Sequence, residues 1–483
     1  MSELILGPII GGLTDTQTYI WGRTDSPATL HAWMGHQPDL SDAELKGTSP
    51  LTADSGCAGV VIIADLTPET HYHYAVTLDD TPPDPVGVPY PEFTTFPSEG
   101  VRQSFSFVFG SCFRPEDENG GEIFYQIESL RQRRAADPKR ALRFMLLIGD
   151  QIYADDVKHN GLGNKGAITL QDYRDVYQYT WSRPPFQRLL TNMPAFMTID
   201  DHEVDDDWVW TDFARTRPII PWWDRLVRWW KRRPKAEYQI SKDRVQAALK
   251  AYWEHQGMHA RGYVNLLDFD PERGRNEMKP DDETSYAYAF DYGAAAFFVL
   301  DTRTRRVKKT WRQRTMLGEG QWEALEKWLL ETKDTHPVKF IVTSCALLFQ
   351  MWADIPKDRW TGFQEERQRL LDFLAANGIE GVHLLTGDLH SAHAVSANLR
   401  GPDGQSIPLW EFCSSPFEQK PNWLAKYTYW PVRSKSIKDQ RLHFICAEHN
   451  FGVVSVEFRS DGKPKVSFEV HQGNGKPPIT LQD

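Results

Sequence analysis

The sequence predicts an α/β protein preceded by a small all-β domain. Short apolar runs separated by turn residues fill positions 1 to about 98, with no helical period among them. From Val101 onward such runs alternate with segments of helical spacing, which is typical of a layered α/β domain with a mostly parallel sheet. At 483 residues the chain also exceeds the usual size of one hydrophobic core, so more than one unit is expected.

The first domain, residues 1–98, is predicted to be a β-sandwich of the fibronectin or immunoglobulin type. A Pro-rich stretch at 81–91 lies in the connection between the last two predicted strands. Residues 97–100 are the expected linker to the second domain. The expected strands are 4–10, 18–22, 29–34, 58–63, 71–76 and 92–96.

The second domain, residues 101–483, is predicted to carry helices at 122–136, 171–190, 319–332 and 363–377, and a β-hairpin of 452–458 with 465–471 that finishes a second sheet. A Trp-rich insertion at about 208–280 interrupts it and contains a helix near 245–256. We interpret it as a surface insertion. The alternative is a lid whose basic residues at 222–235 attract anionic substrates or a membrane surface, through Arg225, Arg228, Lys231, Arg232 and Arg233.

Composition narrows the function classes. The net charge of −11 disfavours nucleic acid as a partner. The N-terminus has neither a basic region nor a signal-like apolar run, so a cytoplasmic location is expected unless a leader was removed. Five widely spaced cysteines do not resemble a disulfide framework.

Polar groups follow five of the apolar runs, at the point where each predicted strand ends. Ligands of open α/β sheets bind outside the carboxyl ends of the strands, so these groups are expected to converge on one site. The five ends are Gly110-Ser111-Cys112, Gly149-Asp150, Asp200-Asp201-His202-Glu203, Asp301-Thr302-Arg303 and Gly387-Asp388-Leu389-His390.

The converging residues predict bound metal. Asp150, Asp201 and Asp388 would raise one another's pKa at close range, and a cation resolves this repulsion. A phenolate from Tyr153 and a thiolate from Cys112 favour ferric iron. Asp201 and the acids after it suit Ca²⁺ or Mg²⁺ at a second position.

Each of these residues has an ordinary structural explanation when it is taken alone, such as a turn aspartate or a buried histidine. Together they favour a two-metal hydrolase, in which a carboxylate bridges the metals and a hydroxide held between them attacks a phosphoryl group. We assign the bridge to Asp150. His202 and Arg303 are the predicted catalytic groups near the developing charge.

The motifs GSC, GDQIY, DDHEV, LDTR and GDLH occur in the order seen in alkaline phosphatase D, and the chain resembles these PhoD-like metallophosphatases over nearly its whole length. The resemblance implies a four-layer αββα core and hydrolysis of phosphomonoesters or phosphodiesters as small-molecule substrates. It also implies Fe³⁺ with Ca²⁺, the iron being held by Cys112, Asp150, Tyr153 and Asp388, and it places His390 as the last-motif histidine, a metal ligand and catalytic group.

This chain departs from the family pattern after DDHEV, where it has Asp205-Asp206-Asp207. Asp206 is our candidate ligand there, and the second metal is open between Ca²⁺, Mg²⁺, Mn²⁺ and Zn²⁺. Two other functions stay open: a dinuclear hydrolase of a non-phosphate ester, and a carbohydrate- or surface-binding protein on a decayed catalytic domain.

Overall fold

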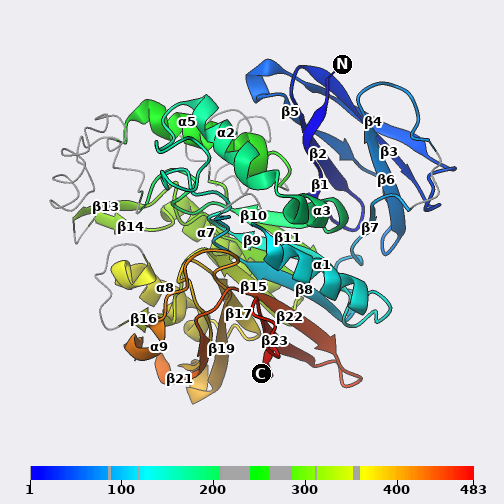
Figure 1. Ribbon diagram of the computed structural model, residues 1–483. Helices are drawn as coiled ribbons and strands as arrows, with labels where there is room; N and C mark the ends of the chain where they lie inside the picture. Colours follow the sequence, from blue (N-terminus) through cyan, green and yellow to red (C-terminus); the bar gives the residue numbers. More distant parts are fainter. Residues whose placement is uncertain are drawn as a thin grey trace, which may run out of the picture.

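The computed structural model describes residues 2–84, 89–116, 120–206, 208, 240–260, 285–310, 313–351 and 359–482. Two small antiparallel sheets at the N-terminus adjoin two larger sheets flanked by helices, a mixed α/β arrangement (Figure 1). Most of the predicted Trp-rich insertion, including 222–235, lies outside the described residues.

The N-terminal sheets have strand orders β1-β2-β5 and β4-β3-β6-β7. Six of these strands match the predicted runs. Strand β4 was missed because its side chains are polar and largely exposed at the edge of its sheet, so it lacks an apolar face. The strands are β1 (Leu4–Gly11), β2 (Thr18–Thr24), β3 (Ala28–Gly35), β4 (Glu44–Leu51), β5 (Ala58–Ile63), β6 (His71–Thr77) and β7 (Glu92–Thr94).

The first large sheet has the order β10-β9-β8-β22-β23-β24. Strands β8, β9 and β10 are parallel, whereas the predicted hairpin of β22 and β23 joins antiparallel beside β8. Its strands are β8 (Phe105–Gly110), β9 (Leu142–Ile148), β10 (Ala195–Thr198), β22 (Asn450–Phe458), β23 (Pro464–Gln472) and β24 (Ile479–Gln482).

The second large sheet has the order β11-β12-β15-β17-β19-β18-β21, with β12, β15, β17 and β19 parallel. Its strands are β11 (Tyr288–Tyr292), β12 (Ala295–Val299), β15 (Val338–Thr343), β17 (Val382–Thr386), β18 (Ala392–Arg400), β19 (Ser406–Cys413) and β21 (Ile437–Cys446). Two short ribbons pair β13 (Val307–Thr310) with β14 (Gln313–Thr315) and β16 (Phe349–Met351) with β20 (Tyr429–Pro431).

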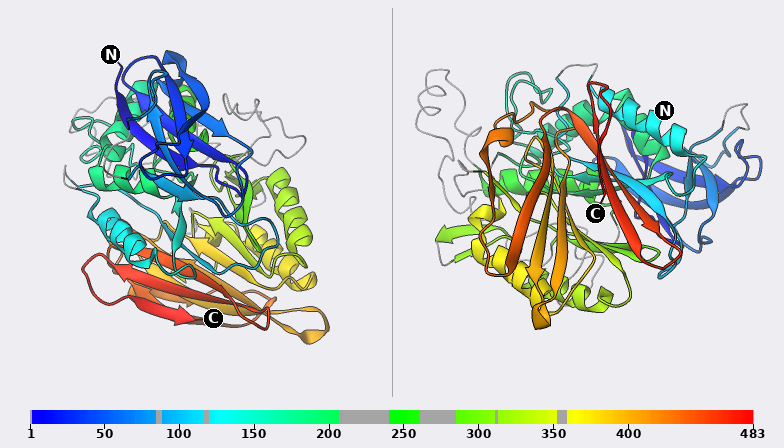
Figure 2. Two further views of the ribbon diagram at one scale, coloured as in Figure 1. Left: turned by 90° about the vertical axis from the view of Figure 1, so that its right-hand side faces the viewer. Right: turned by 90° about the horizontal axis from the view of Figure 1, so that it is seen from below.

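The two large sheets pack against each other (Figure 2), and aromatic side chains fill the space between them. Phe107 of β8 meets Phe297 of β12 at a ring-centroid distance of 5.5 Å, and Phe196 of β10 stacks on Phe290 of β11 at 4.0 Å. Because side chains alternate along a strand, Phe298 points the other way and packs on Trp328 of helix α7 at 5.4 Å. The second sheet therefore buries both of its faces.

Helices cover the outer surfaces of this core. They are α1 (Glu122–Arg134), α2 (Leu170–Trp181), α3 (Pro184–Asn192), α5 (Lys242–Tyr252), α7 (Glu319–Thr332), α8 (Gln364–Ala376) and the short α9 (Ala425–Thr428). The single helix predicted for 171–190 was wrong. Pro184 and Pro185 lack the backbone N–H that a continuing helix requires, so they end one helix and begin the next.

The N-terminal sheets pack on the helices of the second domain. The Trp21 indole donates a hydrogen bond to the Glu254 carbonyl at 2.9 Å, and the Tyr74 hydroxyl donates to the Thr191 carbonyl at 2.7 Å. No helix in the described ranges combines the length and the apolar composition needed to cross a lipid bilayer.

Candidate metal centre at the strand ends

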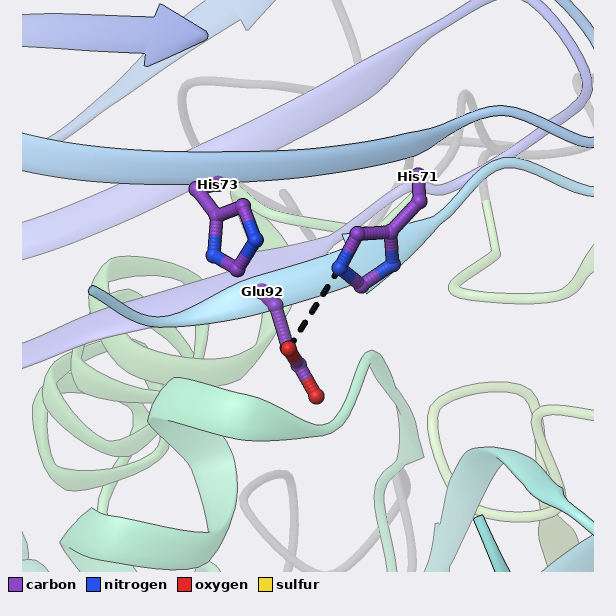
Figure 3. A group of neighbouring side chains, drawn as sticks. All are labelled: His71, His73 and Glu92. Carbon is purple, nitrogen blue, oxygen red and sulfur yellow. Dashed lines mark ion pairs between the residues drawn. The ribbon is translucent and has the colours of Figure 1, made fainter. Parts of the chain in front are cut away.

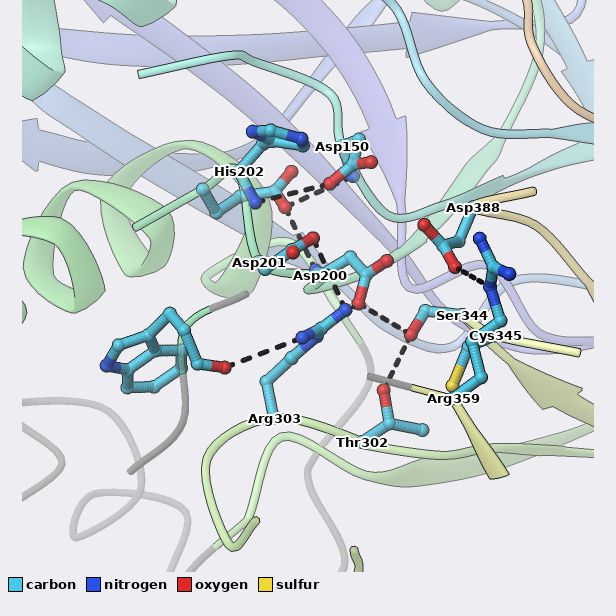
Figure 4. A network of polar contacts seen from close by, with 12 residues as sticks. Asp150, Asp200, Asp201, His202, Thr302, Arg303, Ser344, Cys345, Arg359 and Asp388 are labelled. Carbon is cyan, nitrogen blue, oxygen red and sulfur yellow. Dashed lines mark hydrogen bonds and ion pairs between the residues drawn. The ribbon is translucent and has the colours of Figure 1, made fainter. Parts of the chain in front are cut away.

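The carboxyl ends of parallel strands from both large sheets meet at one place (Figure 4). Asp388, after β17, donates its backbone N–H to Ser111 Oγ after β8 at 3.1 Å. Ser344, after β15, donates to Asp200 Oδ1 after β10 at 2.8 Å. The predicted convergence of strand ends is therefore present, and it includes the end of β15, which the sequence analysis did not single out.

Four residues at these strand ends have a left-handed backbone conformation although none of them is glycine. The φ angles are 63° at Cys112, 55° at Asp150, 61° at Asp388 and 53° at His390. Such conformations cost about 1–3 kcal/mol each and cluster at functional sites, because only a rigid surrounding structure maintains them.

Asp150 is common to three groups of potential metal ligands. The groups are Cys112 with Asp150 and His390, Asp150 with Asp201 and His202, and Asp150 with Asp200 and Asp388. Within each group, one ligand atom per residue lies within 4.8 Å of the others. This spacing suits two cation positions that share Asp150, as expected for a bridging carboxylate.

Tyr153 and Cys112 flank the same carboxylate. The Cys112 thiol and the Tyr153 hydroxyl each lie 3.4 Å from Asp150 Oδ2, and the Tyr153 hydroxyl lies 3.2 Å from His390 Nε2. Ser111 and Ser415 place their hydroxyl oxygens 3.3 Å from the thiol sulfur. The thiol, phenol, imidazole and carboxylate thus share one buried position.

Arg303 and Ser344 hold the end of β10 in place. Arg303 Nε donates to Asp200 Oδ1, and Arg303 Nη2 lies 3.3 Å from Asp201 Oδ1. Arg303 is fully buried, and Thr302 Oγ1 lies 2.6 Å from Ser344 Oγ beneath it. The guanidinium that we predicted near the developing charge therefore contacts two carboxylates of the site.

His202 forms an ion pair at the edge of the site. Its Nδ1 lies 2.7 Å from Asp155 Oδ1, and its backbone N–H donates to Asp150 Oδ1 at 3.3 Å. Burial would lower the pKa of His202, but the carboxylates of Asp155, Asp150 and Asp201 outweigh it and raise the pKa well above its usual range. These carboxylates therefore favour the protonated form of the imidazole.

Glu203 connects the segments that follow β9 and β10 through hydrogen bonds. Its Oε2 accepts the backbone N–H groups of Asp150 at 3.1 Å and Asp200 at 2.9 Å. Its Oε1 accepts the backbone N–H of Gln151 at 2.7 Å and the side-chain amide of Gln256 at 3.0 Å. A single fully buried carboxylate therefore sets the positions of the loops that carry Asp150 and Asp201.

The electrostatics of the site fit bound cations. Burial, reinforced by Asp388, raises the pKa of Cys112 to about 12, and burial with the neighbouring Cys112 raises the pKa of Asp150 well above its usual range. Burial also raises the pKa of Asp200 to about 7, although Arg303 opposes it. Cations stabilise the ionised forms of such groups, and the mixture of hard oxygen donors, one thiol and two imidazoles is a metal-ligand set.

Eight of the nine predicted site residues lie in or around these groups. Cys112, Asp150, Asp201, His202, Asp388 and His390 belong to the groups themselves, and Tyr153 contacts two of their members. Arg303 contacts the site from behind. Asp206 is exposed and belongs to none of the ligand groups among the described residues, so its role stays a prediction.

Sequence reasoning missed four residues of the site. Glu203 stands inside the DDHEV motif and Asp155 follows GDQIY by two residues, but nothing local showed that they would turn inward. Ser344 follows the apolar run of β15 and could have been found by the same strand-end rule. Arg359, whose Nε lies 2.9 Å from Asp388 Oδ2, comes from a connection without a local signal.

The sequence model of the PhoD-like phosphatases matches residues 107–466, most of the chain. This chain belongs to the PhoD-like phosphatase family. Residues 1–95 match a further family, a domain of unknown function (DUF7800).

Relatives of this PhoD-like phosphatase agree in fold. Alkaline phosphatase D of Bacillus subtilis (strain 168) is 25% identical over 330 residues, which cover 62% of this chain and 48% of the relative, so the chain spans about half of that relative's length. The solved structure of PhoD has a TM-score of 0.68 at 18% identity, covering 99% of this chain and 89% of the other. A purple acid phosphatase from yellow lupin (Lupinus luteus) seeds has a TM-score of 0.52 at 12% identity, covering 98% and 74%.

Proposed function

We propose that this PhoD-like phosphatase hydrolyses phosphate esters at the strand-end site. The observation that carries the proposal is the position of Asp150, a buried carboxylate shared by three ligand groups at the ends of strands from two sheets. The family membership and the two phosphatase structures of similar fold support it. We further interpret the two large sheets and their helices as the four-layer αββα core, and residues 1–98 as a β-sandwich domain.

The ligand sets suggest two unlike cations. We propose that Cys112, Asp150, Tyr153 and Asp388 would hold Fe³⁺, with His390 beside them, because a thiolate and a phenolate stabilise the trivalent ion. Asp201, together with the shared Asp150, would hold a hard divalent ion such as Ca²⁺, with Mg²⁺, Mn²⁺ and Zn²⁺ as alternatives. When bound, such a pair polarises the phosphoryl group and lowers the pKa of the attacking water.

Side chains of the protein itself would donate the proton to the leaving group and contact the negatively charged phosphate. His202 is held as a cation by Asp155 and faces the carboxylate cluster, so it is placed to donate a proton to the leaving oxygen. The Arg359 side chain, which pairs with Asp388, is 20% exposed to solvent. The Arg303 side chain is fully buried. We therefore assign contact with the substrate phosphate to Arg359, and the orientation of Asp200 and Asp201 to Arg303.

An exposed apolar surface begins beside the site. The Asn422 backbone N–H donates to the His390 carbonyl at 2.7 Å, and the residues that follow include Trp423, which is 61% exposed, and Tyr427, which is 79% exposed. We propose that these rings contact the organic part of the ester. Trp423→Ala is then expected to raise KM for bis-p-nitrophenyl phosphate several-fold more than KM for the smaller methyl p-nitrophenyl phosphate. Equal changes would contradict this role.

The central test measures turnover and metal content together. The purified chain should hydrolyse p-nitrophenyl or bis-p-nitrophenyl phosphate, and Asp150→Asn and Cys112→Ala should each lose turnover and bound metal. Cys57→Ala is a matched control, because Cys57 is also buried and has a φ of 57° against 63° at Cys112, so alanine meets similar backbone strain in both. Full activity in both site variants, or active protein without iron or a divalent ion, would overturn the proposal.

A further inference from the structure

A second group of metal-ligating side chains lies in the N-terminal domain (Figure 3). His71 and His73 stand two residues apart on β6, so their side chains share one face of the strand. Glu92 is the register partner of His73 on the neighbouring strand β7. The pairing of β6 with β7 therefore brings two imidazoles and one carboxylate together.

The three side chains are arranged with their ligand atoms converging. One ligand atom from each lies within 4.8 Å of the others, and the His71 and His73 rings are 4.8 Å apart between centroids. His73 Nδ1 lies 3.1 Å from the Tyr90 carbonyl oxygen. Because a carbonyl only accepts, Nδ1 must carry the proton, and Nε2 is left as the nitrogen with the lone pair. Such a backbone contact orients metal-binding histidines in other proteins.

Glu92 divides its two oxygens between different partners. Its Oε2 lies 3.4 Å from His71 Nε2, whereas Oε1 lies 3.4 Å from Arg131 Nη1 of helix α1. The arginine thus steadies the carboxylate and leaves the other oxygen facing the histidines. In the absence of an ion, the His71–Glu92 pair joins side chains that are 48% and 38% exposed, and such a pair contributes little stability.

Space for further coordination lies beside the group. A cavity of about 160 Å³ is lined by His71, Glu92, Thr94, Arg131 and Arg143, among others. Two histidines and one carboxylate with an open position are a common arrangement for divalent transition metals, the remaining position being taken by water or an anion. The two arginines would favour an anion there.

This group is independent of the strand-end site. The cavity reaches Leu142 and Arg143 at the start of β9, whereas Asp150 follows the other end of that strand. The 7 residues of β9 span about 20 Å, at roughly 3.3 Å each. No ligand can therefore serve both sites.

We propose that His71, His73 and Glu92 form a second site for one divalent transition-metal ion of the Zn²⁺ class, with an open position toward the cavity. The ion would join β6 to β7 next to the contact of Glu92 with α1. Because it binds the folded arrangement only, it would stabilise this edge of the N-terminal domain by an amount that rises with the logarithm of the free metal concentration above Kd. The proposal does not depend on the phosphoesterase activity.

The test counts zinc in the full-length protein. After removal of metal with a chelator and dialysis against Zn²⁺, the wild type should hold one more equivalent than His71→Ala or Glu92→Gln. Addition of Zn²⁺ should raise the melting temperature of the wild type more than that of either variant. His31→Ala, on neighbouring strand β3, should bind zinc as the wild type does. Phosphatase activity should be the same in all four proteins, since none of these residues touches the strand-end site.

Both His71 and Glu92 are partly exposed, so their substitution leaves the fold intact and the zinc count interpretable. His73→Gln is a further variant of similar polarity for the buried ligand, and at least a tenfold weaker zinc affinity is expected. Equal zinc content in the wild type, His71→Ala and Glu92→Gln would overturn the proposal. Asp150→Asn and Cys112→Ala should lose activity but keep the zinc ion bound by His71, His73 and Glu92. This result would show that the two sites are separate.

Discussion

Glu203 provides the sharpest test of how the strand-end site is positioned. In Glu203→Gln one carboxylate oxygen becomes an NH₂ group that cannot accept a hydrogen bond. Each oxygen of Glu203 accepts two donors, so two of the four donors lose their acceptor whichever way the amide is turned. At about 1–3 kcal/mol for each buried donor left unsatisfied, the free energy of unfolding should fall by about 2–6 kcal/mol.

The same change should also impair catalysis. Two of the donors are the backbone N–H groups of Asp150 and Asp200, and a displacement of about 1 Å in a reacting group can cost on the order of 100-fold in rate. We therefore expect kcat to fall by roughly that factor and metal content to fall with it. Urea unfolding, elemental analysis and turnover of bis-p-nitrophenyl phosphate measure the three effects.

Glu411 is a matched control for this variant. It is also a fully buried carboxylate, and its Oε2 accepts the backbone N–H groups of Leu347 and Leu348 while Oε1 accepts that of Phe349 and lies 2.9 Å from His393 Nε2. Glu411→Gln should thus cost similar stability but retain metal and kcat. If Glu203→Gln loses only stability, as Glu411→Gln should, the positioning role of Glu203 is wrong.

Three further predictions concern single side chains. Arg359→Ala should raise KM about 10-fold or more with a smaller change in kcat, because a charge-assisted bond to phosphate contributes about 1.5–3 kcal/mol, whereas an unchanged KM would rule out substrate contact. Tyr153→Phe should remove visible phenolate-to-iron absorption from the iron-loaded protein, and a persisting band would exclude this ligand. Burial opposes ionisation of Glu469, but His471 and Arg134 lower its pKa to about 2, so its stabilising effect is present above pH 4.5 and lost as the pH falls toward 2. Glu469→Gln should flatten the pH dependence of urea unfolding over that window, and an unchanged profile would contradict the assignment.

Local patterns in the sequence were sufficient for most of the elements and for most of the candidate ligands. Helix α7 occupies the predicted residues 319–332, since its apolar spacing and its boundaries are local properties. The strand-end rule found Cys112, Asp150, Asp201 and Asp388, because a buried parallel strand must deliver its following residues to one edge of the sheet. The five motifs also sufficed to indicate the family.

Other features depended on contacts between distant segments. Nothing near Arg359 in the sequence indicates its ion pair with Asp388, and nothing near Glu203 shows that four donors from three segments surround it. His71, His73 and Glu92 become neighbours only through the register of β6 with β7, which the separate strands do not specify. The sequence by itself determined which residues follow each strand, because the pattern of apolar residues that marks a strand is local. Tertiary structure alone decided which of them face one another, because that depends on packing between elements far apart in the chain.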